Sequence, residues 1–422
     1  MKLNTKRTFF IGLAFLSISA FWQLYDNVVP LILSQTFGLK ETVTGMVMGI
    51  DNVLALFLLP LIGAFSDRVN TRIGKRTPFI LFGTIFAVIF MLLIPFADNT
   101  SNFILFFITL GLVLISMASY RSPAVALMPD LTPKPLRSKA NAIINLMGTL
   151  GGIFTLVAIS TLVADVDKPN YYPVFIAVAL LMVVAVALLL ITTKENKLPK
   201  YTDDNEDEQE DSNKEVHTLP KDVKKSLIFL LLSVFLWFTA YNAVTTAFSR
   251  YATQVWGFGG GSYANALLVA TGAATLAYIP IGIISSKFGR KKTIVGGIII
   301  MTLSYFAGFL CTEYTPLIYV IFAFTGIGWA SISVNSYPMV VEMSRGSDVG
   351  KYTGFYYTFS MLAQTITPIL SGALLEKVSY RTLFPYAVVF SFLSLCTMLI
   401  VKHGDVKPMK KQSALEHFDI ED

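Results

Sequence analysis

Residues Pro60 to Pro78 read PLIGAFSDRVNTRIGKRTP, an apolar run that ends at Asp67 and passes into a strongly basic turn. A second stretch, PIGIISSKFGRKKT from Pro280 to Thr293, has the same plan. In each copy a glycine, Gly63 or Gly282, stands four residues before a polar residue, where a glycine lets two helices approach closely. Because the pattern occurs twice, it indicates that the chain arose by duplication of one unit.

The basic turns have two interpretations, and both remain open. In the first, each turn is only the positive flank of a membrane helix and fixes its orientation. In the second, the acidic residue also pairs with a following arginine across a tight loop. The combination G-x-x-x-D-R and G-[KR]-R resembles the loop between the second and third helices of the major facilitator superfamily, a large class of secondary transporters.

The composition predicts an all-α membrane protein. Of 422 residues, 54% are hydrophobic and 14% are charged, whereas a soluble protein carries about a quarter charged residues. About 20 apolar residues in a row span a bilayer as a helix, because no water is available there to satisfy an open backbone. Twelve such stretches are present. They begin near Thr8, Val43, Phe79, Phe103, Lys139, Tyr171, Ser226, Ser262, Thr293, Pro316, Lys351 and Thr382.

The distribution of positive charge predicts the topology. With twelve spans both termini share a side, and the segments on that side hold 27 of the 33 lysines and arginines. Cytoplasmic loops carry such an excess, so we expect cytoplasmic termini and a plasma-membrane location. The same topology explains the net charge of +6 without a nucleic acid partner.

The apolar pattern stops between residues 194 and 225, where seven acidic residues cluster without aromatics. Like charges at that density repel each other and bury nothing, so we expect a disordered cytoplasmic linker. The linker divides the chain into two six-helix halves, 1–193 and 226–402, and residues 403–422 form a cytoplasmic tail.

The two halves correspond beyond the basic turns. The sequence YDNV from Tyr25 matches YNAV from Tyr241, and Asp130 matches Glu342. The three correspondences have offsets between 212 and 219 residues, about half the chain. This order predicts two parallel halves related by an axis along the membrane normal, which can rock around a site at their interface.

Two runs permit a narrower comparison: GAFSDRVNTRIGKRTPFILFGT, which ends at Thr84, and YRSPAVALMPDLTPKPLRSKANAI from Tyr120. They resemble the sucrose-transporter-like branch of the glycoside-pentoside-hexuronide cation symporter family. The resemblance implies a twelve-helix major facilitator fold and cation-coupled sugar uptake. Where the melibiose-permease branch carries sodium-binding acids, this chain has Ala55, Leu59 and Arg121. The departure favours a proton as the coupling ion.

Three ionisable residues fall well inside apolar spans: Asp26, Asp51 and Arg121. A charge at bilayer depth costs several kcal/mol unless it is paired or faces water. With a rise of ~1.5 Å per residue, both acids lie about 24 to 27 Å from the inner side, so the two carboxylates can share a proton. We expect them to be the coupling residues. Two alternatives stay open, namely that Asp26 caps a helix break and that Asp51 only forms a hydrogen bond.

A sugar presents hydroxyls at its edge and C–H groups on its faces, so its site needs polar side chains beside an aromatic surface. Arg121 either donates to sugar hydroxyls, pairs with a deprotonated acid, or forms a purely structural pair. The other predicted sugar ligands are Trp22, Gln23, Tyr25, Asn27, Tyr241 and Asn242. Weaker candidates of the same kind are Asn141, Asn145, Trp329, Asn335 and Gln364.

A set of charged residues at the cytoplasmic ends of spans is expected to form a gate. Its ion pairs would lock the inner side while the outer side is open, and would break when the halves rock. The predicted gate residues are Asp67, Arg68, Arg72, Lys75, Arg76, Asp130 and Glu342. Arg250, near the outer end of the seventh span, is expected to extend its side chain to the membrane surface.

The sequence therefore predicts a monomeric proton-coupled symporter that imports a sugar, a disaccharide or a glycoside, by alternating access. We expect no enzymatic activity, no metal and no cofactor besides the coupling ion. Two alternatives remain: a proton-coupled exporter of amphipathic compounds, and a membrane sensor that has lost transport.

Overall fold

The computed structural model describes residues 3–133, 136–166, 168–198, 220–343 and 349–405. Within these ranges it contains no β-strand, and twelve helices are long and apolar enough to cross a membrane, as predicted. The helices are α1 (Thr5–Gln35), α2 (Glu41–Arg68), α3 (Thr77–Asn99), α4 (Phe103–Asp130), α5 (Arg137–Leu162), α6 (Tyr172–Thr192), α7 (Lys221–Trp256), α8 (Ala264–Phe288), α9 (Arg290–Leu310), α10 (Leu317–Val341), α11 (Val349–Lys377) and α12 (Leu383–Ile400).

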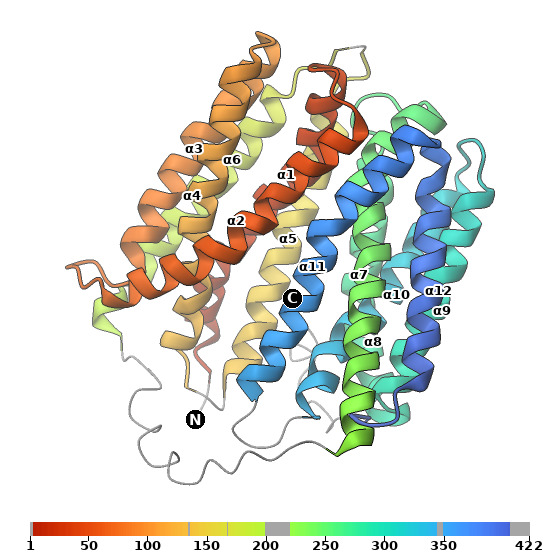
Figure 1. Ribbon diagram of the computed structural model, residues 1–422. Coiled ribbons are helices and arrows are strands. Elements are labelled where there is room, and N and C mark those ends of the chain that lie inside the picture. The colour runs from red at the N-terminus through yellow and green to blue at the C-terminus, as the bar shows by residue number, and fades with distance from the viewer. Residues whose placement is uncertain (1–2, 134–135, 167, 199–219, 344–348, 406–422) are drawn as a thin grey trace.

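The helices form two bundles, α1 to α6 and α7 to α12, which stand side by side in Figure 1. Across the seam α2 packs against α11, α5 against α8 and α1 against α7. The start of α1 and the end of α12 lie at the same end of the molecule, at the bottom of Figure 1. The basic turns after α2 and α8 are also there, so we call it the basic end.

The segment predicted as a linker, 194–225, contains helical residues at both of its ends. A 3-10 helix, η2 (Glu195–Lys197), follows α6 directly, and α7 already begins at Lys221. Both ends of the segment 194–225 are therefore ordered. Its acidic middle lies outside the described residues, as does most of the predicted tail.

The basic end contains a second repeat that the sequence patterns did not reveal. The Glu195 carboxylate accepts hydrogen bonds from the backbone N–H groups of Lys75, Arg76 and Thr77, at 2.8 to 3.0 Å. These groups lie at the start of α3, where N–H groups lack partners within the helix. In the other half Asp405, which follows α12, accepts from the backbone N–H of Lys291 in the first turn of α9 at 2.9 Å. Each half thus uses an acid beyond its sixth helix to cap its third.

At the opposite end the two halves are in close contact. A Cβ atom on Gly45 of α2 would lie 2.0 Å from the carbonyl oxygen of Pro368 in α11. On Gly261, before α8, it would lie 1.9 Å from the carbonyl oxygen of Ile159 in α5. The Gly261 backbone N–H also donates to the carbonyl oxygen of Val163, at 3.2 Å. We call this the closed end, since glycines let the two backbones meet there.

Replacing Gly45 with alanine is expected to favour states in which the closed end opens. Overpacking costs about 1–3 kcal/mol, so the open population should rise at least about fivefold. The measurement is the rate of thiol labelling at Ser371→Cys, a buried position on α11, after both native cysteines are replaced by serine. Gly111→Ala is the matched control, because no atom lies within 4 Å of its added Cβ. Equal labelling in the two variants would contradict the assignment of Gly45 to the seal.

Candidate functional site

A cavity of about 710 Å³ lies between the two halves, within the usual size range of small-molecule sites. Its walls come from α1, α4 and α5 on one side and from α7, α8, α10 and α11 on the other. It extends from the middle of the bundle to Pro129 at the end of α4 and Arg137 at the start of α5. The cavity therefore leads toward the basic end, while the closed end is sealed.

The wall from the C-terminal half offers a flat aromatic surface. Tyr241 of α7 and Trp329 of α10 stack with ring centroids 3.8 Å apart and an interplanar angle of 7°. Phe238 packs edge-on against Trp329 from outside the cavity lining. In the N-terminal half the Arg121 guanidinium lies 6.0 Å from the ring centroid of Trp22, a cation–π distance. An aromatic surface of this kind suits the C–H face of a sugar ring.

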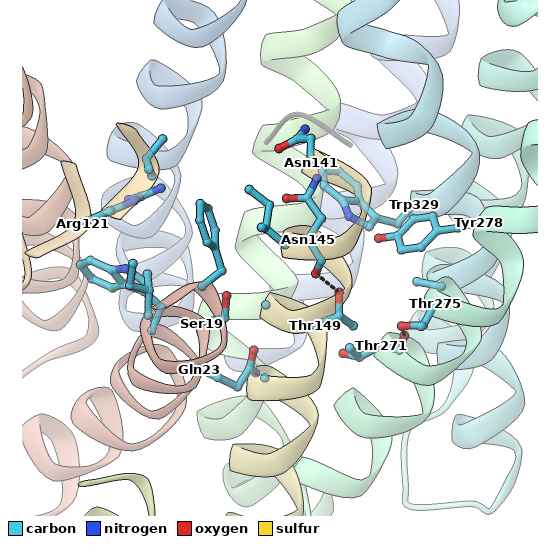
Figure 2. A pocket seen from close by; sticks show the side chains of 18 of the residues that line it. Ser19, Gln23, Arg121, Asn141, Asn145, Thr149, Thr271, Thr275, Tyr278 and Trp329 are labelled. Carbon is cyan, nitrogen blue, oxygen red and sulfur yellow. Dashed lines mark hydrogen bonds between the residues drawn. The ribbon is translucent and has the colours of Figure 1, made fainter. Parts of the chain in front are cut away.

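Polar side chains project into the cavity from two other helices. Asn141, Asn145 and Thr149 follow each other at four-residue spacing along α5, so they share one helical face. Thr271 and Thr275 of α8 lie across the cavity from them in Figure 2. The chemistry is that of amides and hydroxyls, which both donate and accept hydrogen bonds.

The structure brings together part of the predicted sugar site. Trp22, Gln23, Arg121 and Tyr241 line the cavity, and so do the weaker candidates Asn141, Asn145 and Trp329. The remaining predicted ligands take other places. Asn27 lines a second, smaller chamber. Tyr25 and Asn242 are not among the described residues that line the main cavity or this chamber. Sequence reasoning missed Thr149, Thr271 and Thr275, although their helical spacing in apolar spans is a signal that could have found them.

The two acids within the spans, Asp26 and Asp51, are both half-buried and interact electrostatically, but they do not have equal access to the cavity. Asp26 lines a chamber of about 70 Å³ that shares Gln23, Tyr241 and Thr271 with the main cavity. Asp51 lines neither space, and its Oδ1 accepts a hydrogen bond from Asn52 at 3.0 Å. Asp51 is close enough to both Asp26 and Arg121 for their charges to interact. The three ionisable residues predicted at bilayer depth therefore form one electrostatic group.

The predicted gate residues form ion pairs inside each half. Arg76, which is 6% exposed, pairs with Asp67 and with Asp130, the latter at 2.9 Å. This confirms the predicted pairing of the acid with an arginine across the basic turn. Glu342 pairs with Arg290 at 2.6 Å within the other half. These pairs hold helix ends together, and their role as a lock between the halves stays a prediction.

The other basic gate residues lie in the same turn. Arg68 and Arg72 are exposed, and the Lys75 side chain is half-buried. The exposure of Arg68 and Arg72 suits the simpler interpretation of these two residues as orientation signals.

The prediction that Arg250 extends to the membrane surface is wrong. Its side chain is 3% exposed, and its Nε donates to Glu41, at the first position of α2, at 2.6 Å. Tyr380 donates to the other Glu41 oxygen at 2.7 Å. We call these three residues the latch. The ion pair between Arg250 and Glu41 joins the two halves at the closed end. Its two residues are 209 positions apart, so local sequence patterns could not reveal it.

A sequence model of the family described as MFS/sugar transport protein, where MFS denotes the major facilitator superfamily, matches residues 10–401. The chain belongs to this family. The chain is 26% identical over 138 residues to sucrose transport protein SUC3 of Arabidopsis thaliana, covering 28% of this chain and 23% of the relative. It is 33% identical over 142 residues to human proton-associated sugar transporter A, covering 31% of this chain and 19% of the relative. It thus spans less than a quarter of the length of each of these relatives.

The solved structures support the fold independently. A POT family transporter, determined in complex with a thioalcohol-conjugated peptide, superimposes with a TM-score of 0.72 at 12% identity. The match covers 94% of this chain and 95% of the other chain. At that identity the likeness shows a shared fold alone.

Proposed function

We propose that this transporter imports a sugar of disaccharide or glycoside size together with protons, by alternating access. The observation that carries the proposal is the inter-half cavity, whose amides and hydroxyls surround the stacked Tyr241 and Trp329 rings. The mixture matches a sugar, which offers hydroxyls at its edge and C–H groups on its faces. The names of the partial relatives, a sucrose transport protein and a proton-associated sugar transporter, support the same class.

The charged group in the N-terminal half supports proton coupling. Asp26 has contact with the inter-half space, its neighbour Asp51 provides a second negative charge, and Arg121 provides a positive charge that acts on Asp51. A proton on Asp26 removes a charge from the seam between the halves, which lowers the cost of moving the site across the membrane. Each proton driven by ~100 mV supplies about 2.3 kcal/mol.

We also propose that the basic end faces the cytoplasm, because the excess of lysine and arginine lies there. The structure then represents the inward-facing state, with the cavity leading to the cytoplasm and the latch sealing the outside. Rocking of the halves would break the latch and expose the same cavity to the other side.

The test of substrate class is sugar binding to the purified transporter, with sucrose, maltose and melibiose compared by calorimetry. We expect Trp329→Ala to weaken binding of the preferred sugar about tenfold, equivalent to about 1.4 kcal/mol, because half of the aromatic surface is lost. Phe309→Ala is the control, since that ring is exposed on α9 and lines neither space. Unchanged affinity in Trp329→Ala would refute the sugar site at the stacked rings.

A further inference from the structure

The small chamber beside Asp26 includes polar residues that do not line the main cavity, among them Asn27 and Tyr305. It lies between α1, α7, α8, α9 and α10 and has a volume of about 70 Å³. A water molecule occupies about 30 Å³ in the liquid, so the chamber has room for about two. It adjoins the main cavity through Gln23, Tyr241 and Thr271, which line both spaces.

Two buried polar atoms on the chamber residues have no hydrogen-bond partner within the described part of the chain. They are the hydroxyl of Tyr305 and Oδ1 of Asn27, and both residues are 1% exposed. A buried polar group without a partner costs about 1–3 kcal/mol. Water in the chamber would remove this cost, because a buried water binds two to four polar groups. Asp26 provides a further polar group on the same walls.

We propose that this chamber holds a short water chain that carries the proton between Asp26 and the main cavity, with Tyr305 as the residue that positions the water. The inference rests on the proposed function, in which Asp26 carries the coupling proton. On release, the Asp26 carboxyl gives its proton to the adjacent water while the next water passes a proton to the cavity. The carboxylate remains, and loading runs in reverse. Tyr305 donates a hydrogen bond to the chain and keeps its own proton.

Tyr305 is the residue by which α9 contributes to the lining of the chamber. Its ring is buried, yet it reaches the space lined by Tyr241 of α7 and Thr325 of α10. Loss of the hydroxyl alone would leave the ring packing intact. The effect should therefore fall on proton movement, and sugar binding in the main cavity should be unaffected.

The experiment compares Tyr305→Phe with wild type in proteoliposomes, using the sugar that the binding panel selects. We expect net uptake driven by a proton gradient to fall by about tenfold or more, as for loss of a positioned proton-transfer group. Sugar counterflow, which exchanges sugar without releasing the proton, should stay within about twofold of wild type, a change of only ~0.4 kcal/mol. Tyr386→Phe is the matched control, because Tyr386 is also buried and lines neither space.

Each other outcome overturns the relay. A wild-type rate of net uptake in Tyr305→Phe would contradict the proposed water chain. An equal loss of uptake and counterflow, in a variant whose thermal unfolding is unchanged, would contradict it as well. The second result would make Tyr305 a substrate ligand. If Tyr305→Phe fails to fold, Asn27→Ala removes the other unpartnered atom and should show the same split. Wild-type uptake that is insensitive to a protonophore would instead refute the proposed function, and the relay with it.

Discussion

Replacing Asp26 with asparagine is expected to abolish proton-driven sugar accumulation. With a membrane potential of ~100 mV and one proton per sugar, wild-type vesicles should concentrate the sugar about 50-fold. The asparagine variant cannot bind and release the proton, so its ratio of internal to external sugar should stay near one. Counterflow should persist, because asparagine resembles the protonated acid in shape and charge. The measurement is the steady-state accumulation of labelled sugar.

Two further variants make this result specific. Asp222→Asn removes an exposed carboxylate in the first turn of α7, at the basic end, and should accumulate sugar like wild type. Asp51→Asn tests whether the second carboxylate shares the proton or only receives a hydrogen bond from Asn52. Full accumulation in Asp26→Asn would remove Asp26 from the coupling mechanism.

The second large effect is expected at the latch. Glu41→Gln leaves the Arg250 charge buried without its partner in the state described here, in which Arg250 is 3% exposed. Breaking a buried pair in this way costs about 3–5 kcal/mol. When the closed end opens, Arg250 meets water and the cost disappears. The variant should therefore shift toward the state in which the closed end is open by at least about 100-fold, measured as faster thiol labelling at Ser371→Cys.

The double variant Glu41→Leu with Arg250→Met is the control for charge. It removes both members of the pair, so no unpaired charge remains to oppose closure. Labelling at Ser371→Cys should return toward the wild-type rate. Equally fast labelling in the single and double variants would show that the latch acts through packing and that its charge is unimportant.

The fold could be predicted because its signals are local. Each span is a continuous apolar run, and the basic turns at Asp67 and Ser286 repeat at a fixed offset. The site could be predicted only in part, since a sequence gives the depth of a residue more readily than the direction of its side chain. Asp26 and Asp51 are predicted at similar depth, yet of the two only Asp26 lines the chamber between the halves.

The features that the sequence did not reveal are pairs of distant residues. The latch joins Glu41 to Arg250, and Glu195 caps a helix that begins 118 residues earlier. Tyr305 is one of 18 tyrosines, and only the packing of the helices shows that it lines the same chamber as Asp26. Such contacts depend on how the bundles close against each other, which periodicity within a single span does not determine.

The most direct test of the account is uptake of labelled sucrose, maltose and melibiose into proteoliposomes under an inward proton gradient. We predict that at least one of these sugars accumulates above its external concentration and that a protonophore abolishes the accumulation. If no sugar accumulates while the gradient drives an amphipathic cation out of the vesicles, the transporter is a proton-coupled exporter and the sugar assignment is wrong.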